Sequence, residues 1–323
     1  MVFSRGFSYN CSLFIAAFLL PTCWLPTSAN DVSLWVQPIE TDSPVNTNMA
    51  RLGWTVFNDP KLSSNHLISC ASCHDLSSNG AEASSVSTGV GGQGPRNSIT
   101  VFNASLNYRF FWDGRANSLS EQIDGPIHNP LEMASSWPYI VEYMESSTQY
   151  QRLFEQLDLE INEEHIKQGL IAFMEALVTP NAPFDRYLNG NLFAIDDAAK
   201  RGWNLFQTVG CIQCHQGPNI GGSMIQKFGY FVPQPGALDT GKHLVTNNSL
   251  DKFYFRVASL RNVAITPPYF HDGRTQRLQE AIDIMAKGQL GVSLPPDSVK
   301  DIEAFLKSLT APRPYILEVF ESE

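Results

Sequence analysis

The chain has 323 residues, of which 43% are hydrophobic, 11% aromatic and 17% charged. This composition excludes a disordered chain, which would be poor in apolar residues, and a coiled coil, which would be rich in charged ones. The net charge is −10 and there is no basic run, so we expect no nucleic acid as a partner.

Residues 1–29 have the pattern of a secretory signal. Arg5 precedes the apolar run 11–20, and small residues at 27–29 form a cleavage site. The run is too short to cross a bilayer, which takes about 20 apolar residues. We therefore expect export and no stable membrane span after cleavage. Thr22, the residue before Cys23, fits a lipidation signal poorly, but whether Cys23 is lipidated stays open.

The four cysteines beyond the signal form two Cys-x-x-Cys-His motifs, at 70–74 and 211–215. Cysteine pairs alone could be redox dithiols, halves of a zinc site or disulfides. The histidine after each pair instead matches the attachment site of c-type haem, in which two thioethers fix the macrocycle and the imidazole ligates the iron. The sequence therefore predicts two covalently bound haems c, held by the following residues: Cys70, Cys73 and His74, and Cys211, Cys214 and His215.

The surroundings of the two motifs repeat in the same order. The matched stretches are Gly-Trp-x-x-Phe at 53–57 and 202–206, Arg-Asn at 96–97 and 261–262, Phe-x-Asp-Gly-Arg at 111–115 and 270–274, and amphipathic runs at 119–123 and 278–282. Two copies in the same order predict a duplicated haem-binding unit rather than a solenoid.

Helical periodicity dominates the rest of the chain. It predicts a helix from Ile166 to Leu177, capped by Asn162 and ended by Pro180, a second helix capped by Asp297, and a third over 198–206. The Gly-, Ser- and Pro-rich stretches 77–94 and 217–241 indicate functional loops around the haems, with disordered surface insertions as the alternative.

We therefore predict a mainly α fold of two cytochrome-c-like haem domains related by duplication, with long irregular loops. The N-terminal domain covers residues 30–178 and the C-terminal domain residues 179–323, whose tail could pack back on the first domain.

The chain resembles the bacterial di-haem cytochrome c peroxidases, a family that also contains MauG, the maturation enzyme of methylamine dehydrogenase. The resemblance runs from about residue 52 to about residue 309. It is carried by these stretches: Leu-Ser-Ser at 62–64, GPRN at 94–97, FWDGR at 111–115, LEM at 131–133, LVTPNAPFD at 177–185, LRN at 260–262, PYFHDG at 268–273 and QLG at 289–291.

The resemblance implies different roles for the two haems. The haem on His74 resembles the peroxidatic haem, where hydrogen peroxide binds, and the haem on His215 resembles the electron-transfer haem. Met285 matches the second axial ligand of the latter, and thioether ligation raises a haem potential. Without the resemblance, Met285 would be interpreted as a core methionine.

The resemblance also implies three further residues of the site. Glu132 matches the distal acid that moves a proton between the oxygens of peroxide, Gln122 matches a second polar group there, and Trp112 matches the tryptophan between the haems. A surface carboxylate, a helix amide and a buried aromatic are the plain alternatives.

A calcium ion between the domains is implied in the same way. Its protein ligands would be the Asn97 side chain and the carbonyl oxygens of Thr266 and Pro268, all of them oxygen donors.

The chain departs from the family at one position. Many members carry a histidine in the loop before GPRN, and it ligates the peroxidatic iron until the other haem is reduced. Val90 stands there, in a loop one residue shorter, and valine cannot ligate iron. We therefore expect a permanently open peroxidatic haem, although whether reductive activation is needed stays open. His128 is an alternative ligand, but a surface histidine is the plainer interpretation.

The resulting hypothesis is a periplasmic peroxidase that reduces hydrogen peroxide to water with electrons from a small donor, either cytochrome c or a cupredoxin. The family implies a homodimer. The alternative is a MauG-like enzyme that oxidises residues of a partner protein, although MauG itself carries tyrosine at the position of Met285. A plain di-haem electron carrier is disfavoured because it would gain nothing from an open iron.

Overall fold

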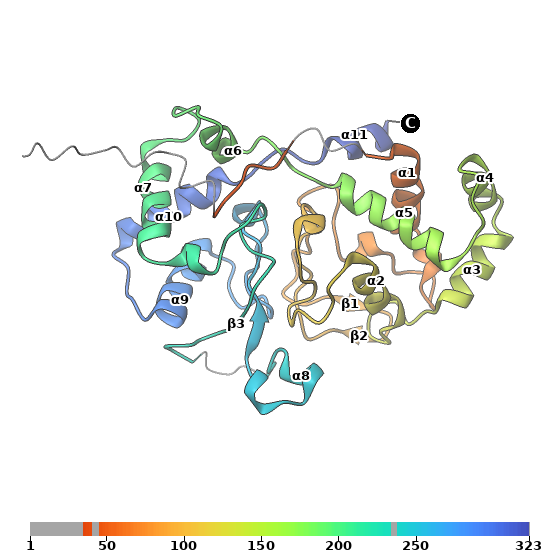
Figure 1. The fold of residues 1–323 in the computed structure, drawn as a ribbon. Helices are drawn as coiled ribbons and strands as arrows, with labels where there is room; N and C mark the ends of the chain where they lie inside the picture. Colours follow the sequence, from red (N-terminus) through yellow and green to blue (C-terminus); the bar gives the residue numbers. More distant parts are fainter. Residues whose placement is uncertain (1–34, 41–44, 234–237, 323) are drawn as a thin grey trace, which may run out of the picture.

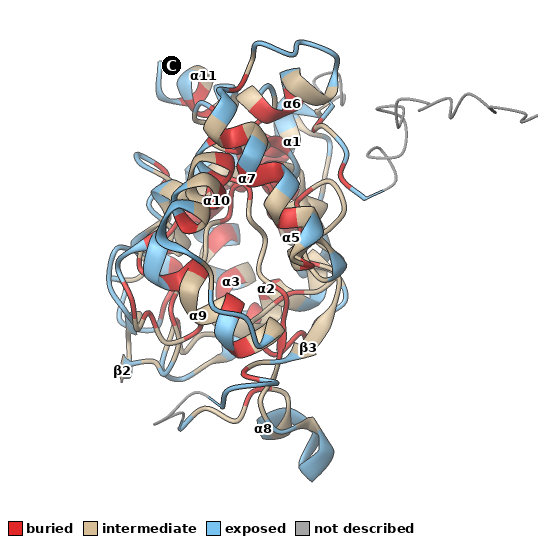
Figure 2. Ribbon diagram, turned by 90° about the vertical axis from the view of Figure 1, so that its left-hand side faces the viewer, coloured by how far each residue is buried: buried red, intermediate tan, exposed pale blue. Residues whose placement is uncertain are grey.

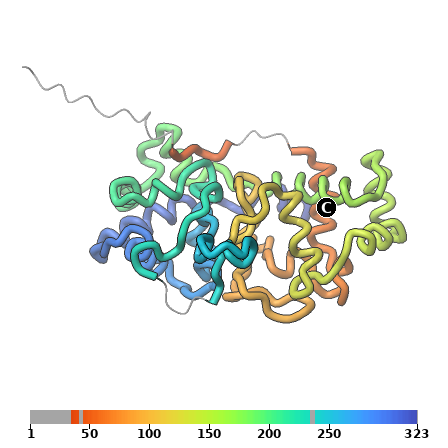
Figure 3. The backbone as a smooth tube through the Cα atoms, turned by 60° about the horizontal axis from the view of Figure 1, so that its bottom comes forward, coloured from red at the N-terminus to blue at the C-terminus, as the bar shows by residue number. Residues whose placement is uncertain are grey.

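The computed structural model describes residues 35–40, 45–233 and 238–322, so the predicted signal at 1–29 lies outside it. Within these ranges, no helix combines the length and the apolar character that crossing a membrane requires. Two helix-rich halves lie side by side (Figures 1 and 3). The prediction of a mainly α fold is confirmed.

Within the ranges that the structure describes, five α-helices belong to the first half. They are α1 (Thr47–Asn58), α2 (Leu119–His128), α3 (Trp137–Ser146), α4 (Thr148–Gln156) and α5 (Glu163–Ala176). Six helices follow. They are α6 (Pro183–Leu188), α7 (Asp197–Thr208), α8 (His243–Thr246), α9 (Leu278–Leu290), α10 (Pro296–Ser308) and α11 (Tyr315–Glu321).

Each half has its own hydrophobic core. The first core gathers buried residues from Ala50 to Leu177 and the second gathers residues from Phe184 to Leu309. The chain ends cross over: Leu317 and Phe320 of α11 pack into the first core, and Val36 packs into the second. In Figure 1, α11 accordingly lies beside α1.

A tightly packed helix pair supports each core: α1 with α5, and α7 with α10. Glycine allows the close approach, because a Cβ on Gly53 would lie 2.0 Å from the Gly169 carbonyl oxygen and one on Gly202 would lie 1.8 Å from that of Asp301. Figure 2 shows buried faces of α5, α7 and α10 turned inward, whereas α8 projects away with an exposed surface.

The helix ends follow from local chemistry. Asn162 caps α5 as predicted, since its side chain accepts a hydrogen bond from the His165 N–H at 2.9 Å. The predicted cap at Asp297 is wrong. The helix α10 begins at Pro296, which suits the first helical position because its ring fixes φ, and Asp297 lies in the first turn.

In their described residues, the stretches predicted to be irregular contain three short strands, one of which pairs with a strand outside them. The strands β1 (Thr88–Gly89) and β2 (Gly92–Gln93) form a hairpin in which Thr88 pairs with Gln93. The strands β3 (Ile225–Lys227) and β4 (Tyr254–Arg256) are also antiparallel, and Ile225 pairs with Arg256.

Each Cys-x-x-Cys-His motif follows a helix, α1 or α7, and comes before a 3-10 turn and a second helix, α2 or α9, but the predicted equivalence of the two Arg-Asn pairs is wrong. In the structure, Asn262 corresponds to Asn103 instead. The sequence separation between these two asparagines equals that between Phe111 and Phe270. Both asparagines have left-handed backbones, with φ of 62° and 61°, and both precede a short 3-10 turn. Both side chains donate to the Thr179 hydroxyl, at 2.7 and 2.9 Å.

In this register Asn97 corresponds to Arg256, and Trp112 to His271. The halves exchange matching backbone hydrogen bonds through these four residues. The Asn97 N–H donates to the His271 carbonyl at 2.8 Å, and the Arg256 N–H donates to the Trp112 carbonyl at 2.7 Å. The boundary between the halves is therefore tied from both sides.

Candidate functional site

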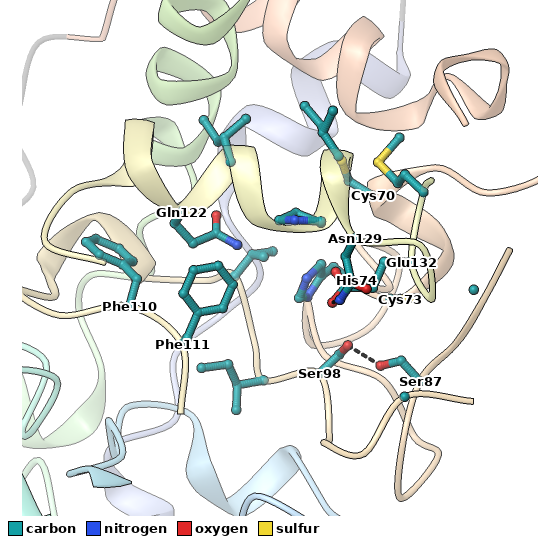
Figure 4. Close-up of a pocket in the computed structure, with 18 of the residues that line it drawn as sticks. Cys70, Cys73, His74, Ser87, Ser98, Phe110, Phe111, Gln122, Asn129 and Glu132 are labelled. Carbon is teal, nitrogen blue, oxygen red and sulfur yellow. Dashed lines mark hydrogen bonds between the residues drawn. The ribbon is translucent and has the colours of Figure 1, made fainter. Parts of the chain in front are cut away.

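The first Cys-x-x-Cys-His motif lines a cavity of about 470 Å³ in the first half (Figure 4). Its walls are mainly apolar, and they bring together seven residues predicted from the sequence: Cys70, Cys73, His74, Asn97, Trp112, Gln122 and Glu132. Gln122 projects from α2, and Glu132 lies in the turn that follows this helix.

The second motif lines a cavity of about 190 Å³ in the second half. Cys211, Cys214, His215 and Met285 line it, and Trp112 contributes from the other half. Met285 lies on α9, the counterpart of α2. The first cavity has more than twice the volume of the second, so it offers more room beside a bound group.

The two motif histidines lie in matching environments. The ring centroids of Phe57 and His74 are 6.3 Å apart, and those of Phe206 and His215 are also 6.3 Å apart. His215 Nδ1 donates to the Ala258 carbonyl at 3.1 Å, which leaves Nε2 available as a ligand.

Ile99 lies beside His74 in the position that Ala258 takes beside His215. Its backbone and that of Gly80 oppose the pKa decrease of the His74 imidazole, although the buried Nδ1 makes no hydrogen bond of good geometry. Burial lowers the pKa of His74 and of His215 to about 4. Both rings are therefore neutral at pH 7, as an iron ligand must be.

The cysteines do not suit thiol redox chemistry. Burial raises the pKa of Cys70 to about 12 and that of Cys73 and Cys211 to about 11, whereas a redox dithiol needs a lowered thiol pKa. In the described ranges, no cluster of three or more His, Cys, Asp or Glu side chains could hold a metal, so zinc has no ligand set there. Two apolar cavities with a thiol pair and a neutral imidazole in each fit covalent haem instead.

Glu132 is a partly buried carboxyl in the first cavity. Burial raises its pKa above the ordinary value, and two smaller effects oppose the increase: the Asn129 side chain donates to Oε1 at 2.7 Å, and Arg115 acts through its charge. Arg115 is held by an ion pair with Asp113, at 2.7 Å, and its guanidinium lies 3.4 Å from the ring centroid of Phe111.

The hairpin β1–β2 docks on the backbone around Glu132. The Val90 N–H donates to the Glu132 carbonyl at 2.7 Å. A Cβ on Gly89 would lie 2.3 Å from the Leu131 carbonyl oxygen, and one on Gly91 would lie 2.4 Å from that of Pro130. Gly89 and Gly94 line the cavity, so the hairpin forms part of its wall.

The helices α2 and α9 present different residues at the equivalent position. Met285 on α9 corresponds to Pro126 on α2, and each lines its own cavity. Proline has no donor atom for iron, so only α9 offers a ligand there. His128 is exposed at the end of α2.

Trp112 lines both cavities, and its indole N–H donates to the Asn97 carbonyl at 2.9 Å. Its ring centroid lies 6.3 Å from that of His271, edge to face. An aromatic ring is therefore placed where the two cavities meet.

Of the predicted calcium ligands, Asn97 lies at the same boundary. Asn97 is buried, and its amide Nδ2 donates to the Ser84 carbonyl at 2.9 Å, which leaves Oδ1 for a cation. Asn97 is joined to the segment after Pro268 through its hydrogen bond to His271. Thr266 ends the 3-10 turn 263–265 just before that segment.

Two parts of the site are not predicted from the sequence. They are the docked hairpin and Arg256, a buried residue that lines both cavities. The glycines at 89 and 91 are a signal for close backbone contact, and the corrected repeat register would have placed Arg256 opposite Asn97.

Comparison with known proteins agrees with this geometry. The family model of the di-haem cytochrome c peroxidases matches residues 47–192. A cytochrome c551 peroxidase of Nitrosomonas europaea is 42% identical over 288 residues, which cover 86% of this chain and 85% of the relative. That of Pseudomonas aeruginosa is 41% identical and covers 84% of this chain and 82% of its own.

More distant relatives include MauG. The methylamine utilization protein MauG of Methylorubrum extorquens is 31% identical over 83% of this chain and 80% of its own. A solved MauG-like protein associated with microbial copper homeostasis has a TM-score of 0.73 at 25% identity, covering 91% of this chain and 95% of its own. Family model, relatives and site geometry agree, and the chain belongs to the di-haem cytochrome c peroxidase family.

Proposed function

We propose that this protein is an exported, periplasmic di-haem peroxidase that reduces hydrogen peroxide to water with two electrons and two protons per turnover. One observation carries the proposal: two matching cavities differ in that the first holds a partly buried acid, Glu132, and the second holds a methionine, Met285.

Covalent haem c would be held in the first cavity by Cys70, Cys73 and His74 and in the second by Cys211, Cys214 and His215. Bound there, the haems supply iron that takes up peroxide and stores and passes on electrons. Met285 would ligate the second iron together with His215 and raise its potential, which suits a site that collects electrons.

Glu132 moves the proton in the first cavity. Its ionised carboxylate accepts a proton from peroxide and returns it to the departing oxygen, so that water leaves rather than hydroxide. The raised pKa of Glu132 suits this exchange because burial makes the carboxylate a stronger base towards peroxide. The Gln122 amide offers a second hydrogen-bonding group on the same cavity wall.

The first site stays open to peroxide in this proposal. Pro126 and Val90 cannot ligate iron, and the hydrogen bond from Val90 to the Glu132 backbone keeps the hairpin docked. The protein therefore needs no reductive activation.

Trp112 would pass electrons between the haems, since its indole borders both cavities. A calcium ion on Asn97, Thr266 and Pro268 would brace the same boundary. The domains would be the haem units 30–178 and 179–323, related by duplication.

The donor would be a small periplasmic cytochrome c, as the names of the relatives suggest, with a cupredoxin as the other option. Export by the signal at 1–29 fits the periplasmic site. The net charge of −10 favours a basic donor whose encounter weakens with salt. We also propose a homodimer, on the family resemblance alone.

A second candidate function is MauG-like oxidation of residues on a partner protein. The replacement of the loop histidine by Val90 is compatible with this candidate as well, since an open first site serves both chemistries. Met285 favours the peroxidase, because MauG differs at that position.

An EPR spectrum of the oxidised protein as isolated tests the open site. A high-spin ferric signal from one of two haems is expected. Low-spin signals alone would contradict the proposal. Peroxide turnover with reduced cytochrome c separates the two functions. The MauG-like candidate predicts no such turnover and, in its place, a stable high-valent species.

A further inference from the structure

Arg256 lies at the end of β4, between the two cavities. It is only 3% exposed, yet it lines both of them. Its backbone is fixed from two sides, by pairing with Ile225 and by the hydrogen bond to the Trp112 carbonyl. The guanidinium is therefore held at the boundary by a rigid backbone.

The described contacts of this guanidinium are with neutral groups. Nε donates to the Phe111 carbonyl at 3.2 Å, and Nη1 donates to the Ser259 hydroxyl at 3.4 Å. Burial lowers the pKa of Arg256 to about 10, and no carboxylate opposes the decrease. A buried positive charge at pH 7 is thus left without a negative partner among the residues that the structure describes.

Two other inward arginines form ion pairs with carboxylates, in contrast to the described contacts of Arg256. Arg96 pairs with Asp113 and Asp239 at 2.5 and 2.6 Å. The equally buried Arg261 pairs with Asp185 at 2.6 Å. The fold therefore supplies carboxylates to Arg96 and Arg261, whereas no ion pair is found for Arg256 within the described part of the chain.

A buried charge is costly unless an anion compensates it. Arg256 lines both cavities and has no carboxylate partner among the described residues, so a group bound in the cavities is the anion within its reach. Haem carries two propionate carboxylates, and a guanidinium binds carboxylates in a bidentate manner.

We propose that Arg256 binds propionate carboxylates of both haems and is their shared counter-charge. The inference rests on the proposed function, in that both cavities must hold haem. A positive charge beside a haem favours the reduced iron, which carries one positive charge fewer. Arg256 therefore raises both reduction potentials and, next to Trp112, acts as a positioning residue for the path between the haems.

The test is a spectroelectrochemical titration of both haems in the complete haem-loaded protein. Arg256→Gln removes the charge, Arg256→Lys keeps it, and Arg152→Gln removes an exposed charge on α4 as the matched control. We expect Arg256→Gln to lower the equilibrium constant for reduction of each haem about tenfold, which is about 59 mV per electron. Arg256→Lys should retain most of the potential, and Arg152→Gln should change neither haem.

Changes below twofold at both haems in Arg256→Gln, or an equal shift in Arg152→Gln, would overturn the proposal. A shift at one haem alone would overturn the shared role. If Arg256→Gln fails to retain haem while Arg256→Lys retains two haems, the counter-charge is supported. The proposed function is tested separately, by the haem content and peroxide turnover of the unmodified protein.

Discussion

The substitution Gly89→Ala probes the docked hairpin, because residue 89 meets the backbone that carries Glu132. Its Cβ would lie 2.3 Å from the Leu131 carbonyl oxygen and 2.5 Å from that of Glu132. These distances are roughly 1 Å short of a normal contact. Since the facing atoms are backbone, the hairpin or the 130–132 turn has to move by about that amount.

The displacement affects both stability and rate. Overpacking of this kind costs about 1–3 kcal/mol of unfolding free energy. It also stretches the 2.7 Å hydrogen bond from Val90 to Glu132. A misplacement of about 1 Å in a reacting group lowers a rate about 100-fold, so we expect this loss in kcat/KM for peroxide.

Stopped-flow reduction of peroxide by the haem-loaded protein measures the effect. Gly94→Ala is the matched control, because its Cβ would meet only the Ser87 carbonyl oxygen, at 3.7 Å. We expect it to react like the unmodified protein. If Gly89→Ala keeps two haems and at least half of the rate, or if Gly94→Ala loses as much, the hairpin does not position Glu132.

Three further predictions concern single side chains. Glu132→Gln should lower kcat/KM for peroxide by about 10²–10⁴-fold with an unchanged ferric spectrum, and a loss below tenfold would remove Glu132 from the proton transfer. Arg115→Met removes a charge that lowers the Glu132 pKa, so this pKa should rise and activity should be lost at a higher pH when the solution is acidified. Arg115→Lys keeps the charge and should not shift the pH profile. A shift to lower pH in Arg115→Met would contradict the assignment. Met285→Leu should lower the reduction potential of the second haem only. The control Met144→Leu, in the first core, should change neither potential. An unchanged potential of the second haem in Met285→Leu would exclude Met285 as a ligand.

The parts of the fold that were predicted depend on local chemistry. The Cys-x-x-Cys-His motifs are contiguous, and α5 has its apolar period and its Asn162 cap in one stretch of chain. The cap at Asp297 was wrong because two prolines, at 295 and 296, decide where α10 begins.

The remaining features depend on contacts between distant residues. The two Arg-Asn pairs look alike in sequence, but the equivalence is set by the left-handed backbones of Asn103 and Asn262. The contact between Val90 and Glu132 and the position of Arg256 between the cavities exist only once the halves are packed together.

The central claim is an open first haem site that reduces peroxide without activation. Steady-state peroxide turnover with reduced cytochrome c, with and without prior reduction of the protein, tests it most directly. The account predicts equal rates from the first turnover under both conditions. Turnover that appears only after prior reduction would contradict it.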